Sequence, residues 1–243
     1  MDEIIQVKQL SKSYGSNAVV KELDLTVKKG EIVGLLGANG AGKTTSIECI
    51  LGIRKPEEGF VSILGRNPRK DRKVLFQKVG VQFQEANYQN EIRVDELCEE
   101  TASLYKNPED FRELLKQFGI AEKLKMQVKK LSGGERQRLF IILALIPNPD
   151  IVFLDELTTG LDTRARREVW KTIEALKKKG LTILLTSHFM DEVEALCDQI
   201  CILKKGETVF KGTVAEAIEQ SPYEKLEDAY LWYSDQEEEN EDF

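Results

Sequence analysis

The chain has 243 residues, of which 41% are hydrophobic and 32% are charged, values that are ordinary for a globular domain. Its 35 lysines and arginines are outnumbered by 42 aspartates and glutamates, so the formal net charge is −7. This acidic balance argues against a general nucleic-acid binder, which needs a basic face, although a local basic patch is compatible with it. The longest unbroken apolar run, Leu139 to Pro147, is shorter than the about 20 residues that span a membrane.

The N-terminal sequence MDEIIQVKQL lacks the basic start and apolar stretch of a secretory signal. The four cysteines, at positions 49, 98, 197 and 201, form no C-x-x-C pair. This favours buried free thiols in a reducing cytoplasm. One alternative is that Cys197 and Cys201 share a helix face as metal ligands, although the chain has a single histidine to join them.

Strand-like segments open the chain at 4–9, 19–21 and 23–27, and an apolar run at 32–36 predicts a strand covered on both faces. Helical spacing dominates from about 85 to 148, with one helix start predicted at Pro108–Glu109. Two more buried strands are predicted at 151–154 and 182–186, and two more helices at 164–178 and 190–197. Strands that alternate with helices predict an α/β domain with a mostly parallel sheet, into which the helical stretch is inserted as a subdomain.

The C-terminal part divides into a helix and a tail. The stretch 222–233 places Leu226 and Tyr233 on one helical stripe, and the acidic end DQEEENEDF is predicted to be disordered. We interpret Tyr230, Trp232 and Tyr233 as side chains that cover the protein's own surface. A partner-binding site is the alternative.

The segment Gly37–Thr44, GANGAGKT, fits the pattern G-x-x-x-x-G-K-[ST] at every fixed position, between a predicted buried strand and a helix. Glycines let the backbone wrap around phosphate with its N–H groups pointing inward, and the helix start adds favourable partial charge. Lys43 can reach the β- and γ-phosphates, and the Thr44 hydroxyl can coordinate Mg²⁺. The alternative is a glycine-rich turn with a chance lysine. The expected nucleotide-binding residues here are Gly37, Ala38, Asn39, Gly40, Ala41, Gly42, Lys43, Thr44 and Thr45.

Two carboxylates, Asp155 and Glu156, follow the predicted strand at 151–154 directly. The carboxyl ends of strands form the edge at which ligands bind in open α/β sheets. We therefore expect Asp155 to hold Mg²⁺ through water and Glu156 to act as general base on the attacking water. An exposed acidic turn is the alternative. Because the sequence contains no N-K-x-D guanine-reading motif, adenine is favoured over guanine.

The segment Leu131–Arg138, LSGGERQR, predicts the start of a long apolar helix. Ser132 is a good N-cap residue, and Glu135 has the capping-box spacing. The glycines leave backbone N–H groups bare, so this helix end can bind an anion. A helix cap without a ligand is the alternative.

Together these motifs resemble the nucleotide-binding subunit of an ABC transporter, over roughly residues 3–215. Gln84, in VGVQFQE, matches the family's glutamine at the junction of the core and the helical subdomain. Tyr14, in LSKSYG, matches the aromatic that stacks on adenine. Leu161–Asp162, in TTGLDT, matches the loop at the dimer interface, and His188, in LLTSHFMDE, matches the switch histidine.

The resemblance implies an α/β fold with a P-loop NTPase core and a mostly parallel sheet, an N-terminal antiparallel β subdomain and an inserted α-helical signature subdomain. It places the ABC ATPase domain at 1–220, with the helical subdomain at about 85–148, and the C-terminal helix and acidic tail at 221–243. ATP and Mg²⁺ are the implied cofactors. The implied metal-site residues are Thr44, Gln84 and Asp155, and the implied catalytic residues are Lys43, Gln84, Glu156 and His188.

The resemblance also implies that two ATPase subunits, identical or paralogous, bind ATP between them, head to tail. The signature residues that contact the other subunit's ATP would be Leu131, Ser132, Gly133, Gly134 and Glu135. The sequence departs from the family's commonest pattern at Ala38, Leu157 and Glu135. None of these departures removes a group that contacts phosphate or metal.

Four individual assignments have alternatives. Gln82 competes with Gln84 for the junction role, and Tyr14 could be an ordinary edge aromatic. His188 could be a core imidazole, and Asp162 could serve only as a helix N-cap.

The implied partners are integral membrane permease subunits that dock near 84–96, with no nucleic acid expected. The implied location is cytoplasmic and peripheral, on the inner face of the cell membrane. VGVQFQEANYQNEIRVDE and LEDAYLWY look similar to ATPases of the drug- and lipid-exporting branch. We therefore expect an ATP-hydrolysing subunit that drives an exporter. The alternative is a soluble non-transport ABC ATPase, such as an assembly or regulatory factor.

Overall fold

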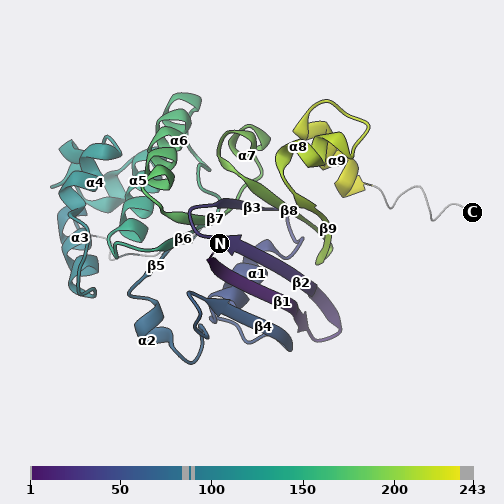
Figure 1. The fold of residues 1–243 in the computed structure, drawn as a ribbon. Coiled ribbons are helices and arrows are strands. Elements are labelled where there is room, and N and C mark those ends of the chain that lie inside the picture. Colours follow the sequence, from purple (N-terminus) through teal and green to yellow (C-terminus); the bar gives the residue numbers. More distant parts are fainter. Residues whose placement is uncertain (1, 84–87, 89–90, 236–243) are drawn as a thin grey trace, which may run out of the picture.

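The computed structural model describes residues 2–83, 88 and 91–235. Figure 1 shows two sheets, a three-stranded one in the order β2-β1-β4 and a six-stranded one in the order β5-β6-β7-β3-β8-β9. The smaller sheet contains β1 (Glu3–Tyr14), β2 (Asn17–Lys28) and β4 (Glu58–Ile63). The larger sheet contains β3 (Ile32–Leu36), β5 (Val79–Gln82), β6 (Ile151–Leu154), β7 (Thr182–Thr186), β8 (Gln199–Lys204) and β9 (Glu207–Gly212).

The small sheet is antiparallel, with β1 between its two partners. The two predicted strand pieces at 19–21 and 23–27 belong to one strand, β2, which continues through an irregularity at Glu22, where φ is +48°. The strand β4 was not predicted, because its first three residues are exposed and its three buried residues, Val61, Ser62 and Ile63, include a serine. The antiparallel N-terminal subdomain that the resemblance implied is confirmed.

In the large sheet, β3 and its neighbours run parallel, and only β9 is antiparallel to its partner β8. The strands β6, β7 and β3 are adjacent, with Leu154 opposite Leu185 and Leu35 opposite Thr186. Their carboxyl ends therefore meet at one edge of the sheet. The glycine-rich loop, the acidic pair and the loop with His188 all leave from this edge, which is where the site forms.

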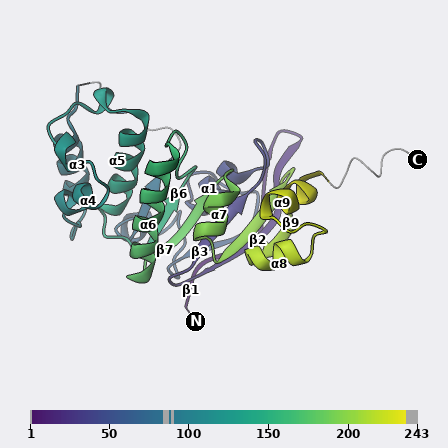
Figure 2. The same ribbon diagram turned by 90° about the horizontal axis from the view of Figure 1, so that it is seen from above.

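The helices are α1 (Lys43–Ile50), α2 (Arg72–Leu75), α3 (Val94–Ser103), α4 (Phe111–Gln117), α5 (Gly133–Leu145), α6 (Thr163–Lys178), α7 (Met190–Leu196), α8 (Val214–Glu219) and α9 (Leu226–Asp235). In Figure 2, α3, α4 and α5 form a group at one end of the molecule, and α8 and α9 lie at the other end.

Two helix starts differ from the prediction, and one helix was not predicted. Helix α4 begins one turn later than Pro108, because the Asp110 side chain accepts a hydrogen bond from the Arg112 N–H (2.9 Å) and caps it. The C-terminal helix begins at Leu226 and not at 222. Helix α8 was not predicted, although the Thr213 and Glu216 side chains form a capping box at its start.

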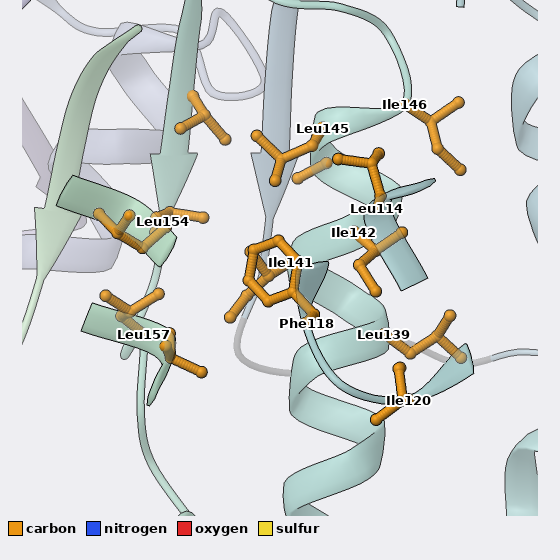
Figure 3. Packing of buried hydrophobic residues seen from close by; sticks show 14 of the residues in the cluster. Leu114, Phe118, Ile120, Leu139, Ile141, Ile142, Leu145, Ile146, Leu154 and Leu157 are labelled. Atoms are coloured by element: carbon orange, nitrogen blue, oxygen red, sulfur yellow. The ribbon is translucent and has the colours of Figure 1, made fainter. Parts of the chain in front are cut away.

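Side chains on the two faces of the large sheet belong to different parts of the core, because they alternate along each strand. Ile183 and Leu185 pack with the helical group, whereas Leu184 between them packs with the small sheet and α1. Figure 3 shows the apolar side chains of α5 packed against Leu114 and Phe118 on one side and towards Leu154 and Leu157 on the other. This packing fixes α5 to the strand end that carries the acidic pair.

The cysteines are free thiols; Cys49, Cys98 and Cys201 are buried and Cys197 is half-buried. Cys201 lies in β8, whereas Cys197 ends α7, so the two do not share a helix face and the metal-ligand alternative is wrong. Within the described residues, no group of three or more His, Cys, Asp or Glu side chains could hold a metal ion. No helix of the part that the structure describes is long and apolar enough to cross a membrane.

Candidate functional site

The glycine-rich loop between β3 and α1 is packed so tightly that side chains are excluded at two of its glycines. At Gly42, which caps α1 with φ +102°, a Cβ would lie 2.5 Å from the Val19 carbonyl oxygen. At Gly37, a Cβ would lie 2.5 Å from the Leu203 carbonyl oxygen. The loop is therefore held against β2 and β8, with its conformation set by glycine.

Lys43 is buried at the first position of α1 and points back into the loop. Its ammonium group donates hydrogen bonds to the carbonyl oxygens of Gly37 (2.7 Å) and Ala38 (3.1 Å). Burial lowers the Lys43 pKa, while the charges of Glu156 and Asp155 oppose that shift. The cation is thus oriented towards the loop and faces the two acids across it.

An open cavity of about 680 Å³ lies over the loop. The cavity is lined by every predicted residue of the loop except Ala41, which is buried. It also contains Asp155, Glu156 and His188. Two further residues of the wall, Val19 and Tyr230, were not predicted for this place. The structure therefore brings together the loop, both acids and the histidine.

Asp155 is almost fully buried at the end of β6, and its carboxylate accepts a hydrogen bond from the Thr186 hydroxyl (2.5 Å). Burial raises the pKa of Asp155, and the Thr186 hydrogen bond and the charge of Lys43 act against that rise. The Glu156 N–H donates to the same Thr186 oxygen (2.9 Å). Thr186 was not predicted as a site residue, although a polar residue at the end of the buried strand 182–186 was a usable signal.

The donor set fits magnesium. The Asp155 carboxylate and the Thr44 hydroxyl line the same cavity, and Mg²⁺ prefers oxygen ligands of this kind, usually one or two carboxylates with water and phosphate.

Glu156 has an unusual backbone conformation, with φ +52° in a residue that is not glycine. Its carboxylate accepts a hydrogen bond from the Thr159 hydroxyl (3.2 Å), and its Oε1 lies 4.0 Å from the Nδ1 of His188. The His188 side chain is 49% exposed, so the alternative of a core imidazole is wrong. The imidazole is stacked at a tilt on Phe189, with ring centroids 4.1 Å apart.

The two candidate glutamines have different outcomes. The Gln82 amide is buried and donates to the carbonyl oxygens of Phe83 (2.9 Å) and Asp155 (3.0 Å), so it holds β5 against the end of β6. Gln84 lies outside the described residues, and its role at the metal stays a prediction.

Tyr14 ends β1 and is about half exposed. The Lys12 ammonium lies 5.2 Å from its ring centroid, and the Arg54 guanidinium 5.6 Å. Among the described residues that line the phosphate cavity, Tyr14 is absent. Its exposed ring is free of the close packing of a core aromatic, which leaves stacking on a base open to it.

The start of α5 has the predicted capping box. The Glu135 N–H donates to the Ser132 hydroxyl (3.2 Å), and the Ser132 N–H donates to the Glu135 carboxylate (2.8 Å). Lys123 forms an ion pair with Glu135 (2.9 Å), so the glutamate at this departure from the family pattern has a charged partner. None of the residues 131–135 lines the phosphate cavity, so this helix start is not part of the same site within one subunit.

The loop Leu161–Asp162 lies beside the start of α5. A Cβ on Gly134 would lie 3.1 Å from a methyl carbon of Leu161. The Asp162 carboxylate accepts a hydrogen bond from the Ala165 N–H (2.8 Å), so its role as N-cap of α6 is confirmed. The other departure, Leu157, is fully buried in the core that α5 shares, and its carbonyl oxygen accepts from the Gln137 amide (2.9 Å).

A glycine-rich loop after a parallel strand, a buried lysine at the start of the next helix and a carboxylate at the end of a nearby strand define a nucleotide-binding domain of the P-loop class. Comparison with known proteins narrows this class. A sequence profile described as "ABC transporter" matches residues 20–159. The Nod factor export ATP-binding protein I of Cupriavidus metallidurans is 37% identical over 224 residues, which cover 90% of this chain and 74% of that protein.

Two solved structures agree. One, an ATP-binding subunit of an ABC transporter, superimposes with a TM-score of 0.86 at 28% identity, over 95% of this chain and 99% of that one. The other, a dimeric ATP-binding cassette bound to ADP and Pi, has a TM-score of 0.77 at 25% identity, over 86% and 98% of the two chains. The chain therefore belongs to the ABC transporter family, as its ATP-binding and ATP-hydrolysing subunit.

Proposed function

We propose that this subunit hydrolyses ATP to drive separate membrane permease subunits of an exporter, with a drug- or lipid-like substrate. The observation that carries the proposal is the convergence of Lys43, Asp155, Glu156 and His188 on one cavity over the phosphate loop. Export is supported by the relative named for Nod factor export. A soluble non-transport ATPase is the alternative.

The residues divide the chemistry among them. Lys43 and the backbone N–H groups at the start of α1 bind the β- and γ-phosphates. Asp155 and Thr44, with Gln84, would hold Mg²⁺, which when bound neutralises phosphate charge. Glu156 accepts a proton from the attacking water as the bond from the γ-phosphorus to its bridging oxygen breaks.

His188 is the neighbour of the base. Its Nδ1 lies 4.0 Å from the Glu156 Oε1, so a shift of about 1 Å would bring the two atoms to hydrogen-bond distance. In our proposal the imidazole keeps the Glu156 carboxylate and the water aligned, with the γ-phosphate between them.

The second half of the site comes from another ATPase subunit, a second copy of this chain or a paralogue. The start of α5 offers an exposed Ser132 and bare N–H groups away from its own cavity, which suits an anion held by another subunit. The dimeric relative bound to ADP and Pi supports this arrangement. Leu131 to Glu135 would close the γ-phosphate side, and Leu161–Asp162 would cross the interface.

The permease would dock on the helical group. A shallow groove of about 640 Å³ is lined by Glu91, Arg93, Glu96, Glu122, Lys125, Met126, Gln127 and Lys130. It overlaps the stretch 84–96 that the sequence indicated. We propose that a cytoplasmic helix of the permease binds there, which places the subunit in the cytoplasm against the inner face of the membrane. The division into an ATPase domain at 1–220 and a C-terminal extension belongs to the same proposal.

The ATPase roles are tested by replacing the base. Glu156→Gln removes the proton acceptor and keeps the shape, so MgATP binding should persist while phosphate release falls at least about 100-fold. With MgATP the variant should elute as a dimer on size exclusion. Glu194→Gln, an exposed glutamate of α7, is the matched control. Wild-type turnover in Glu156→Gln would refute the assignment, and a monomer with MgATP would refute the shared site.

The transport role is tested by capture from native membranes in mild detergent, followed by mass spectrometry. A polytopic membrane protein in near-equal amount is expected. Lys130→Glu, in the groove, should reduce that recovery, whereas Lys171→Glu on the exposed side of α6 should not. If only soluble partners are recovered, the non-transport ATPase is the better proposal.

A further inference from the structure

A carboxyl group that the chemistry above does not use is buried beside the site. Glu192, in the first turn of α7, has 0% exposure. Its Oε1 accepts hydrogen bonds from the Thr158 hydroxyl (2.6 Å) and from the Trp170 indole N–H (3.0 Å). Burial raises the Glu192 pKa, and hydrogen bonds to the carboxylate act against that rise. A buried carboxyl is seldom worth more to stability than an apolar residue of the same shape, so its position is the more informative property.

On one side, Glu192 holds the turn that begins at Glu156. Thr158 is fully buried in this turn. The Leu161 N–H donates to the Thr158 carbonyl oxygen (3.1 Å), and the Thr159 N–H donates to the Glu156 carbonyl oxygen (3.2 Å). A hydrogen bond to Thr158 therefore acts on the segment between the general base and the loop Leu161–Asp162.

On the other side, Glu192 holds the loop that carries His188. The Glu192 N–H donates to the Phe189 carbonyl oxygen (3.1 Å), and the Phe189 N–H donates to the Ser187 hydroxyl (3.0 Å). Helix α6 clamps the same loop from outside, because the Arg166 guanidinium lies 3.9 Å from the Phe189 ring centroid. The backbone of Glu192 is thus hydrogen-bonded to the residue that follows His188.

We propose that Glu192 is a positioning residue for ATP hydrolysis. It connects the Glu156 turn, through Thr158, to the His188 loop, through α7, and so fixes the separation of the base and the imidazole. The inference depends on the proposed roles of Glu156 and His188. It extends them, because a movement of Leu161–Asp162 on contact with a second subunit would reach His188 through the same carboxyl.

Two substitutions remove this connection from opposite ends. Glu192→Leu removes the carboxylate that accepts the hydrogen bond and fills its place with an apolar side chain of similar size. Thr158→Val removes the hydroxyl that donates the hydrogen bond and keeps the branched Cβ. Each should lower kcat about tenfold and leave the KM for MgATP within about twofold, since the cavity itself is untouched. The double variant should be no slower than either single one, because both break the same hydrogen bond. Glu192→Gln keeps an oxygen acceptor and should recover most of the lost kcat.

Thr182→Val is the matched control. Thr182 is fully buried at the opposite end of β7, and its hydroxyl accepts a hydrogen bond from the Gly30 N–H (3.0 Å). This variant should lose thermal stability and keep its kcat, which separates general destabilisation from positioning. If Glu192→Leu does not fold, Thr158→Val and Glu192→Gln decide the question.

The inference is overturned if Thr158→Val or Glu192→Leu has wild-type kcat below its unfolding temperature, or if their effects on kcat add in full. This failure differs from a failure of the proposed function. Glu156→Gln with normal turnover would refute the function itself, whereas an inactive Glu156→Gln beside a fully active Glu192→Leu would refute only the role of Glu192.

Discussion

The phosphate loop and the start of α5 are both glycine-rich helix starts, yet they are built in opposite ways. At the phosphate loop, glycines with positive φ bend the chain over its own lysine, and a cavity opens above it. At the start of α5, Ser132 has an extended conformation, and a capping box closes the turn. The difference shows that a helix start becomes a ligand site through its surroundings. The phosphate loop shares its cavity with the acidic pair and His188, whereas residues 131–135 do not line that cavity.

The largest expected effect is on the phosphate-loop side. Lys43→Ala removes the ammonium group that lines that cavity, and charge-assisted hydrogen bonds of this kind contribute about 1.5–3 kcal/mol each. The Kd for ATP should rise about 30-fold and ATP hydrolysis should fall further, as measured by titration and by phosphate release. The exposed Lys73→Ala on α2 is the control. ATP binding and hydrolysis like the wild type would contradict the loop assignment.

On the α5 side, binding and hydrolysis should separate. Gly134→Asp adds a carboxylate where an anion is expected and presses its Cβ on Leu161. ATP binding should stay within about twofold, because the phosphate cavity is elsewhere, while hydrolysis falls about 30-fold and the MgATP-dependent dimer is lost. Asn107→Asp, exposed in the same helical group, controls for the added charge. Equal loss of binding and hydrolysis would mean that the two regions are not independent.

The third prediction concerns how the helical group is held. Burial alone would raise the pKa of Asp95, but hydrogen bonds from Arg93 (3.0 Å) and Lys125 (2.5 Å) outweigh it and hold that pKa at about 2. Asp95→Asn should lower the free energy of unfolding by about 2 kcal/mol at pH 7 and leave ATP binding unchanged.

The lowered pKa of Asp95 predicts that its contribution to stability depends on pH. Because the folded pKa is below the unfolded value of about 3.9, the contribution of Asp95 is complete above that value and is lost as the pH falls towards 2. Urea unfolding of wild type and Asp95→Asn at pH 7, 4 and 2.5 should therefore show a difference that narrows only at acid pH. A difference that stays constant over this range would contradict the ion pair.

The smallest effect tests how far the cavity wall extends. Tyr230 reaches the cavity from α9, which is anchored by the Tyr233 hydroxyl as it donates to the Ala217 carbonyl oxygen (3.3 Å). Tyr230→Ala should raise the KM for ATP about threefold through lost contact area. Leu231→Ala, exposed on the same helix, should leave it unchanged. No change in Tyr230→Ala would mean that the nucleotide does not use this wall.

The sequence was sufficient where chemistry and burial coincide in a short segment. The strands at 32–36, 151–154 and 182–186 are buried along their whole length, and each contains an apolar run that is visible in the sequence. The segments that follow these strands contain the glycine-rich loop, the acidic pair and His188. The start of α5 was predicted because its capping box is local. These elements supply most of the candidate site.

The remainder depends on contacts that are distant in sequence. Strand β9, like β4, exposes its first residues, and β5 has four residues only, so periodicity could not reveal them. The burial of Gln82 results from pairing with β6. Nothing near Tyr230 in sequence indicates that α9 folds back to a loop almost 200 residues earlier. Such placements are decided by packing between elements.

The buried cysteines can be used to follow local opening of the structure. Burial raises the pKa of Cys49 to about 11 and that of Cys98 to about 12, so neither forms appreciable thiolate at neutral pH even before access is considered. Cys49 lies in α1 behind the phosphate loop, and Cys98 lies in α3 of the helical group. Alkylation of either thiol requires local opening of the structure around it. The alkylation rate of Cys49 therefore reports opening around α1, and that of Cys98 reports opening of the helical group. If nucleotide slows the alkylation of Cys49 and not that of Cys98, it makes the region around α1 rigid and leaves the helical group as it was.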